Sequence, residues 1–169
     1  MRTFTLLSTL LPCVGACSSQ PAGSGVDGGA DSPDGPNILS LSANVDRLTE
    51  SDPPLMISAV VTDPQGIDDV IGGQLVAPQG GTYATFATAA AEGAYGVTLT
   101  WEAIGQVAPI DEPAGGGERV FRAQFFDTAG HETTADLPIT MACSWTSSAL
   151  CAGECTYLPS DRYNCGACG

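Results

Sequence analysis

Apolar and polar residues alternate in short runs along the middle of the chain, and Gly, Pro, Asp and Asn residues separate these runs. A period of two over about four to eight residues is the pattern of a β-strand with one buried face. The runs that show it cover residues 38–43, 56–61, 73–76, 82–86, 95–101, 120–126 and 132–140. Such closely spaced short strands predict an all-β fold, a sandwich of antiparallel sheets over residues 37–142.

Two local patterns between these strands refine the prediction. Residues 87–92, with the sequence ATAAAE, have helical propensity, but so short a run usually yields to its tertiary surroundings. Residues 127–130, with the sequence DTAG, favour a hairpin turn, because Asp127 can accept hydrogen bonds from nearby backbone N–H groups and Gly130 tolerates a positive φ. We therefore expect this turn to join the last two strands.

Three segments of the predicted sandwich are similar to those of a known group of domains. They are TDPQGIDDV at 62–70, GAY at 93–95 and FDTAGH at 126–131. Together they resemble the immunoglobulin-like and fibronectin-III-like modules of bacterial surface proteins, which show D-x-x-G-[IV]-x-x-V, G-x-Y and D-x-A-G-N segments. His131 stands where these modules usually have Asn. The resemblance implies an Ig-like β-sandwich but says little about function, because unrelated functions share this fold.

An uncharged apolar run occupies residues 4–12 and follows the basic residue Arg2. It has the size of a signal-peptide h-region and is shorter than the roughly 20 residues that cross a bilayer. The next residues, Val-Gly-Ala-Cys at 14–17, resemble the lipobox of bacterial lipoproteins. The resemblance implies that residues 1–16 are a signal peptide and that Cys17 receives lipid, diacylglycerol and palmitate. Ordinary secretory cleavage, which would leave Cys17 as a free thiol, is the alternative.

The segment that follows Cys17 has the composition of a linker. Residues 18–36 are almost entirely Gly, Ser, Pro, Ala and Asp, which bury too little apolar area to offset the entropy of ordering. We expect residues 17–36 to form a disordered, lipidated stalk that holds the sandwich away from the membrane. Ser18 stands where inner-membrane lipoproteins of many Gram-negative bacteria carry Asp, so the resemblance implies the outer membrane or cell surface.

Cysteine is concentrated in the last 27 residues, a tail over 143–169. The tail contains Cys143, Cys151, Cys155, Cys165 and Cys168. Disulfides are the expected chemistry in an exported protein, because thiols oxidise there and the tail has few aliphatic residues for a core. Zinc on the C-x3-C and C-x2-C pairs and a redox role for the last two cysteines are the alternatives. The sequence does not choose among the pairings.

The tail also carries the most specific string in the chain. Residues 151–155 and 161–169 resemble the C-x3-C…D-x-x-N-C-G-x-C-G repeats of exported proteins from myxobacteria and their relatives. Those repeats usually continue to another cysteine beyond the final glycine, whereas this sequence stops at Gly169. Either Cys143 completes the set, one thiol is free, or this chain is truncated.

The net charge of the chain argues against nucleic acid as a partner. The chain has five arginines, no lysine and 19 carboxylates, for a formal charge of −14. Because no basic stripe is present to neutralise phosphates, nucleic-acid binding is disfavoured. The same charge repels anionic lipid, so attachment to a membrane requires the covalent anchor.

The acidic turns suggest one kind of ligand, while catalysis has no support. Calcium binds carboxylate and carbonyl oxygens, and the candidate ligands that could meet at one end of the sandwich are Asp63, Asp68, Asp69 and Asp127. The single histidine, His131, is expected to be an exposed turn residue, and no Ser-His or Cys-His relay can be assembled. We expect no other cofactor, no catalytic residue and no small-molecule substrate.

These expectations combine into one functional hypothesis. The chain is expected to be a non-enzymatic, membrane-anchored lipoprotein of the cell envelope that displays, adheres or binds a protein or glycan through an Ig-like module. The alternatives are a calcium-dependent binding module and, less favoured, an envelope thiol/disulfide factor that uses Cys165 and Cys168.

Overall fold

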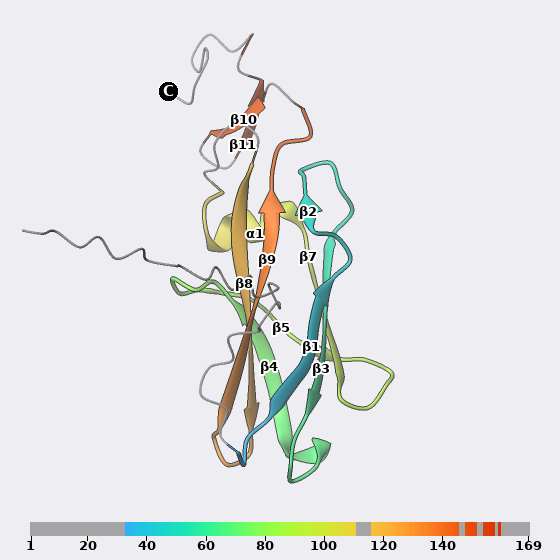
Figure 1. The fold of residues 1–169 in the computed structure, drawn as a ribbon. Helices are drawn as coiled ribbons and strands as arrows, with labels where there is room; N and C mark the ends of the chain where they lie inside the picture. Colours follow the sequence, from blue (N-terminus) through green and yellow to red (C-terminus); the bar gives the residue numbers. More distant parts are fainter. Residues whose placement is uncertain (1–32, 111–115, 146–147, 152–153, 158, 160–169) are drawn as a thin grey trace, which may run out of the picture.

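The computed structural model describes residues 33–110, 116–145, 148–151, 154–157 and 159, and in this part of the chain two β-sheets face each other across one core (Figure 1). The four-stranded sheet has the order β1-β3-β7-β6, and the five-stranded sheet has the order β2-β9-β8-β4-β5. The strands are β1 (Asn37–Ala43), β2 (Arg47–Leu48), β3 (Leu55–Thr62), β4 (Val70–Val76), β5 (Thr82–Thr85), β6 (Ala87–Thr88), β7 (Ala94–Leu99), β8 (Gly117–Asp127) and β9 (Glu132–Met141). All neighbours pair antiparallel except the short β2, which pairs parallel with β9. The predicted all-β fold with antiparallel sheets is confirmed.

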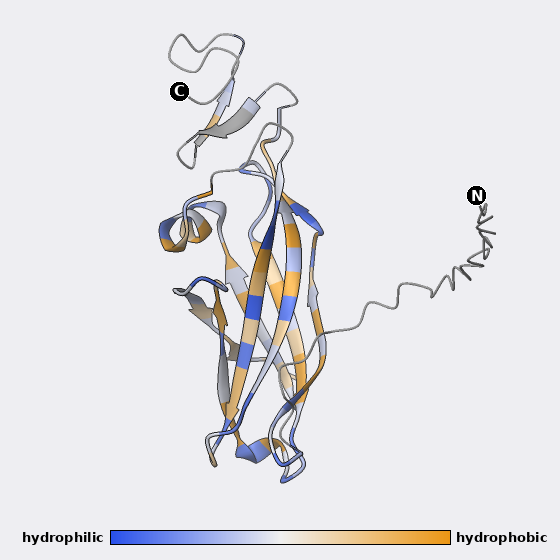
Figure 2. Cartoon of the chain, turned by 60° about the vertical axis from the view of Figure 1, so that its left-hand side comes forward, coloured by the Kyte–Doolittle hydropathy of each residue, from blue (hydrophilic) through white to orange (hydrophobic). Residues whose placement is uncertain are grey.

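The two-residue period that predicted the strands is the period of burial. Along β3 the odd-numbered residues, from Leu55 to Val61, are buried and the even-numbered ones are exposed. In β8 the buried positions are Phe121, Ala123, Phe125 and Asp127. Figure 2 shows the resulting alternation of apolar and polar positions along the long strands. Side chains of opposite hydropathy therefore point to opposite faces of each sheet.

Aromatic rings connect the two sheets in the core. The ring of Phe125, on β8, lies 4.9 Å from that of Tyr95, on β7 of the opposite sheet, measured between centroids. It also lies 5.0 Å from the ring of Phe86, where the chain passes from β5 to β6 and so from one sheet to the other. Gly73 lies on β4, the neighbouring strand of the same sheet, where it pairs with Phe125. Because Gly73 has no side chain, it leaves the space that the Phe125 ring occupies.

One predicted strand is too long, because its last residues belong to a helix. Strand β7 ends at Leu99, and α1 (Trp101–Val107) follows it, whereas the sequence predicted a strand through residue 101. The Oγ1 of Thr100 accepts a hydrogen bond from the backbone N–H of Ala103 at 3.2 Å and caps the helix. The segment 87–92, by contrast, holds β6 and a turn and no helix, as predicted.

A small hairpin continues from the sandwich after β9. It consists of β10 (Ser148–Cys151) and β11 (Glu154–Tyr157), which pair antiparallel. A disulfide between Cys143 and Cys155, with Cα atoms 5.6 Å apart, ties this hairpin to the end of β9. The hairpin lies at the opposite end of the sandwich from the β8–β9 turn (Figure 1). Within the described residues no helix has the length and apolar character of a membrane span.

Candidate metal centre

The turn after β3 is built by an aspartate and a glycine. Oδ1 of Asp63 accepts a hydrogen bond from the backbone N–H of Gln65 at 2.8 Å. The Gly66 N–H donates to the Asp63 carbonyl at 3.1 Å, and Gly66 has a φ of 114° that residues with a side chain rarely adopt. A single turn of 3-10 helix, η1 (Ile67–Asp69), then leads into β4. The local sequence thus reverses the chain and points two carboxylates toward the same end.

The turn between β8 and β9 carries the third carboxylate. Oδ1 of Asp127 accepts the backbone N–H of His131 at 2.7 Å, and Oδ2 lies 2.6 Å from the Nδ1 of the same histidine. Gly130 closes the turn with a φ of 87°. The predicted hairpin at 127–130 is therefore present, but His131 is half-buried and paired, whereas the sequence predicted an exposed turn residue.

Backbone pairing brings these two turns into contact. Val70 at the start of β4 pairs with Asp127 at the end of β8. Thr128 donates its backbone N–H to the carbonyl of Asp69 at 3.0 Å and its hydroxyl to Oδ1 of the same aspartate. As a result, one carboxylate oxygen from each of Asp63, Asp69 and Asp127 lies within 4.8 Å of the other two.

Two of these three acids are almost completely removed from solvent. Asp63 is 6% exposed and Asp127 is 1% exposed, while Asp69 is partly buried. Oδ2 of Asp63 is buried and accepts no hydrogen bond from any residue that the structure describes. A buried polar atom without a partner costs about 1–3 kcal/mol, and more when it is charged. This oxygen therefore indicates a missing partner.

Among the described residues, His131 is the one cationic side chain that forms an ion pair with the cluster. Burial raises the pKa of Asp127, but the hydrogen bonds from the side chain and backbone of His131 outweigh it and lower that pKa overall. The hydrogen bond to Asp127 correspondingly raises the pKa of His131 above its usual 6.5. At most one positive charge is thus set against three carboxylates, and that charge is bonded to Asp127.

The four predicted ligands divide three to one. Asp63, Asp69 and Asp127 come together, whereas Asp68 is exposed and lies outside the cluster. Residues 68 and 69 are neighbours, and the single turn of η1 directs their side chains apart. Sequence reasoning missed the contacts of His131 and Thr128 with these acids, although the i, i+4 spacing of Asp127 and His131 within a tight hairpin was a usable signal.

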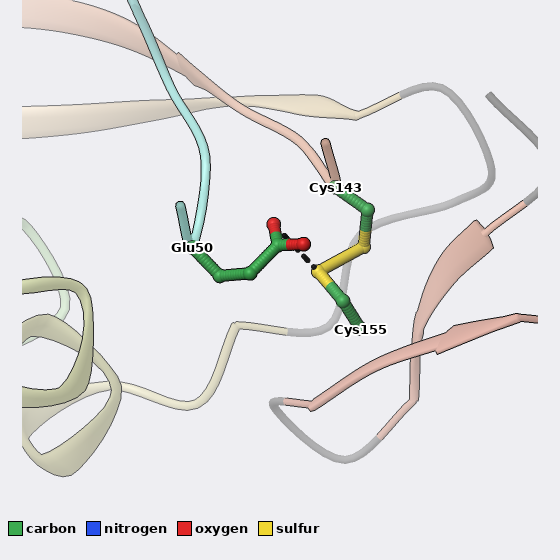
Figure 3. A group of neighbouring side chains, drawn as sticks. All are labelled: Glu50, Cys143 and Cys155. Carbon is green, nitrogen blue, oxygen red and sulfur yellow. Dashed lines mark hydrogen bonds between the residues drawn. A yellow bond between two sulfur atoms is a disulfide. The ribbon is translucent and has the colours of Figure 1, made fainter. Parts of the chain in front are cut away.

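A second acidic group surrounds the disulfide. The carboxylate of Glu50 accepts hydrogen bonds from the backbone N–H and the hydroxyl of Ser144, at 3.0 and 2.5 Å. One oxygen also lies 3.2 Å from the Sγ of Cys155 (Figure 3). Because the two sulfurs are bonded to each other, they offer no thiolate to a metal. We therefore interpret Glu50 as a residue that holds the hairpin against the sandwich through its contacts with Ser144 and Cys155, and not as a metal ligand.

The same disulfide decides among the predicted uses of the tail cysteines. Cys143 pairs with Cys155, which removes Cys155 from the four-thiolate zinc set that the spacing allowed. The lipidation site Cys17, the two cysteines Cys165 and Cys168, and the side chain of Cys151 lie outside the described residues.

A groove beside the end of α1 contains two of the five arginines. It has a volume of about 520 Å³ and includes Arg119, Arg122 and Asp136 in its lining. Arg119 donates to the carbonyl oxygens of Ala108 and Pro109 at the end of α1, and Arg122 forms an ion pair of 2.7 Å with Asp136. Both arginines already have partners, so this groove lacks the unsatisfied group that distinguishes the Asp63 cluster.

Comparison with protein-family models, curated proteins and solved structures finds no match to this chain.

Proposed function

We propose that this chain is a non-enzymatic lipoprotein of a Gram-negative cell envelope, anchored through Cys17, that holds an Ig-like binding or display module away from the outer membrane. The observation that supports export best is the Cys143–Cys155 disulfide, because disulfides persist in oxidising compartments outside the cytoplasm. The signal-like residues 1–16 and the lipobox-like residues 14–17 provide the route and the anchor.

Strand order supports the Ig-like part of this proposal. In immunoglobulin domains, strands A-B-E-D form one sheet and C-F-G the other. The order β1-β3-β7-β6 corresponds to A-B-E-D, and β9-β8-β4 corresponds to G-F-C, with β5 in the place of C′. Modules of this architecture bind partners through the loops at one end or through an exposed sheet face. A protein or glycan of the envelope is the partner class that we propose.

The anchor is tested by acyl labelling of the full chain in a Gram-negative host. We expect Cys17→Ala to lose the fatty-acid label and to leave the membrane fraction, because a lipid chain contributes about 0.8 kcal/mol per buried CH₂. Cys13→Ala is the matched control, since Cys13 lies within the proposed signal peptide and should not affect labelling. Unchanged label and membrane retention in Cys17→Ala would overturn the proposal.

The geometry favours a second candidate function, a calcium-dependent binding module. Its support is the convergence of Asp63, Asp69 and Asp127, which come from two turns far apart in the sequence.

A further inference from the structure

We propose that Asp63, Asp69 and Asp127 form a Ca²⁺ site between the β3–β4 and β8–β9 turns. The inference goes beyond the envelope role, provides the second candidate function with its binding site, and does not depend on the lipid anchor, because it rests only on the described carboxylates. A chain that lacks Cys17 should bind the ion, and a chain that lacks the site should remain anchored.

The buried oxygen of Asp63 carries the proposal. A carboxylate that is 6% exposed has lost most of its hydration, and its Oδ2 has no protein donor among the described residues. The side-chain amide of Gln65 does not donate a hydrogen bond to Oδ2. When its nitrogen faces Asp63, this nitrogen lies 2.7 Å from Oδ1 of Asp63 and 2.7 Å from the carbonyl oxygen of Asp34. Buried carboxylates in proteins are paired or bind metal, so a cation beside Oδ2 is the partner that this geometry lacks.

The spacing of the three carboxylates fits within one calcium coordination sphere. Ca²⁺ binds oxygens at about 2.3–2.6 Å, so two ligands on opposite sides of the ion are about 4.6–5.2 Å apart. One oxygen from each of the three aspartates lies within 4.8 Å of the other two, which is the spread that one such sphere allows. Mg²⁺ requires distances of about 2.0–2.1 Å in a stricter octahedron, and Zn²⁺ prefers nitrogen and sulfur. An all-oxygen set argues against zinc, and because Mg²⁺ is usually bound through only one or two carboxylates, a set of three carboxylates favours calcium.

The ion would link the two sheets. Asp63 follows β3 of the four-stranded sheet, whereas Asp69 and Asp127 flank the β4–β8 pairing of the five-stranded sheet. The same end receives the chain before β1, because the carbonyl of Asp34 faces the Gln65 side chain. Calcium bound here would stabilise the sandwich at the end where β1 begins (Figure 1).

The affinity should be that of an extracellular module. The described residues offer three carboxylates, and one of them is already bonded to His131. Extracellular calcium modules bind with dissociation constants of about 0.1–1 mM, and we expect a value in this range.

Calcium alone is the probe, added to the full chain after it is purified in non-ionic detergent and treated with chelator. We expect 10 mM CaCl₂ to raise Tm by about 5–15 °C, because an ion that binds the native state and not the unfolded state stabilises the native state. Calorimetric titration should give one site, with Mg²⁺ at least about tenfold weaker. A wild-type Tm that calcium does not change would overturn the proposal.

Variants assign the effect to the site. Asp63→Asn should abolish the calcium shift and should raise the Tm of the calcium-free protein, because it removes a buried, unpaired negative charge. The matched control is Asp68→Asn, which removes the same charge from the same turn outside the cluster and should change the dissociation constant by less than about twofold. Should Asp63→Asn fail to fold, Asp69→Asn tests the same loss. Equal loss in Asp68→Asn and in the cluster variants would indicate diffuse screening and overturn the site.

Discussion

At the scale of single residues, steric demands that depend on a distant partner determine which substitutions the fold tolerates. In the sequence, Gly73 is simply a residue of low strand propensity within a predicted strand. In the structure, a Cβ there would lie 2.5 Å from the ring of Phe125 and 2.8 Å from the carbonyl oxygen of Gln124. Gly105, in α1, is different, since a Cβ would contact only Ile110, at 3.8 Å.

We expect Gly73→Ala and Gly105→Ala to change stability in opposite directions. Overpacking a core costs about 1–3 kcal/mol, so Gly73→Ala should lower the free energy of unfolding by that amount. Alanine in a helix interior is about 0.5–1 kcal/mol better than glycine, so Gly105→Ala should raise it. Denaturant titration of both variants measures the two values, and a neutral Gly73→Ala would contradict the close packing of Phe125.

The ion pair between Arg122 and Asp136 gives a prediction on pH. The hydrogen bond from Arg122 lowers the pKa of Asp136 below 3.8. A carboxyl group with a lowered pKa stabilises the fold at pH values above its unfolded pKa, and this contribution disappears as the pH falls through the folded pKa. Because both side chains are more than a third exposed, the contribution should be no more than about 0.5–1 kcal/mol.

A double-mutant cycle measures this contribution. The coupling energy between Asp136→Asn and Arg122→Gln should be positive at pH 6 and should vanish well below pH 3.8. Coupling that persists in acid would show that packing of the two side chains, and not their charge, is responsible.

At the scale of elements, periodicity predicts strands well and their ends poorly. The strands β3, β8 and β9 follow the predicted runs closely, because each has one face on the core and one in solvent. Helix α1 was missed because WEAIGQV is too short for a helical period to show, and its stability depends on the Thr100 cap and on buried Ile104. The hairpin of β10 and β11 was missed because its two strands have only four residues each, too few for alternation to identify them.

The disulfide should stabilise the hairpin much more than the sandwich. Cys143 and Cys155 are 12 residues apart, and a closed loop of about 15 residues contributes about 3 kcal/mol. We expect the double variant Cys143→Ser, Cys155→Ser to lose amide protection over 148–157 while β3 and β8 keep theirs. Hydrogen exchange checks this, and the double variant is used so that no thiol is left to exchange partners. Global loss of protection would contradict a separable hairpin.

At the scale of the whole molecule, the two ends of the sandwich carry different kinds of side chains. The acidic cluster lies at the end where the chain enters β1, and the disulfide-linked hairpin lies at the other (Figure 1). Trp145 and Tyr157 are exposed at the hairpin end, with ring centroids 6.3 Å apart. The whole sequence has a formal net charge of −14.

This negative charge leads to a prediction on how the protein binds lipid membranes. Without the proposed anchor, the Cys17→Ala chain should not bind vesicles of phosphatidylglycerol at any salt concentration, because its sequence has five arginines against 19 carboxylates. The lipidated protein should remain on membranes in 1 M NaCl, since acyl insertion is insensitive to salt. Flotation of both proteins on vesicles measures this. Binding of Cys17→Ala at low salt, reversed by NaCl, would contradict an anchor that acts alone.

The sequence by itself determined what depends on neighbours along the chain. Alternation in β3 and β8 predicted the strands because side chains of a strand alternate between its faces, and the DTAG turn was predicted because Asp127 and Gly130 act within four residues. Only the tertiary structure decided which distant groups meet. It brought Asp127 to Asp63, left Asp68 in solvent and chose Cys155 as the partner of Cys143. These choices depend on strand order and register, which arise from the packing of two whole sheets and leave no local signal in the sequence.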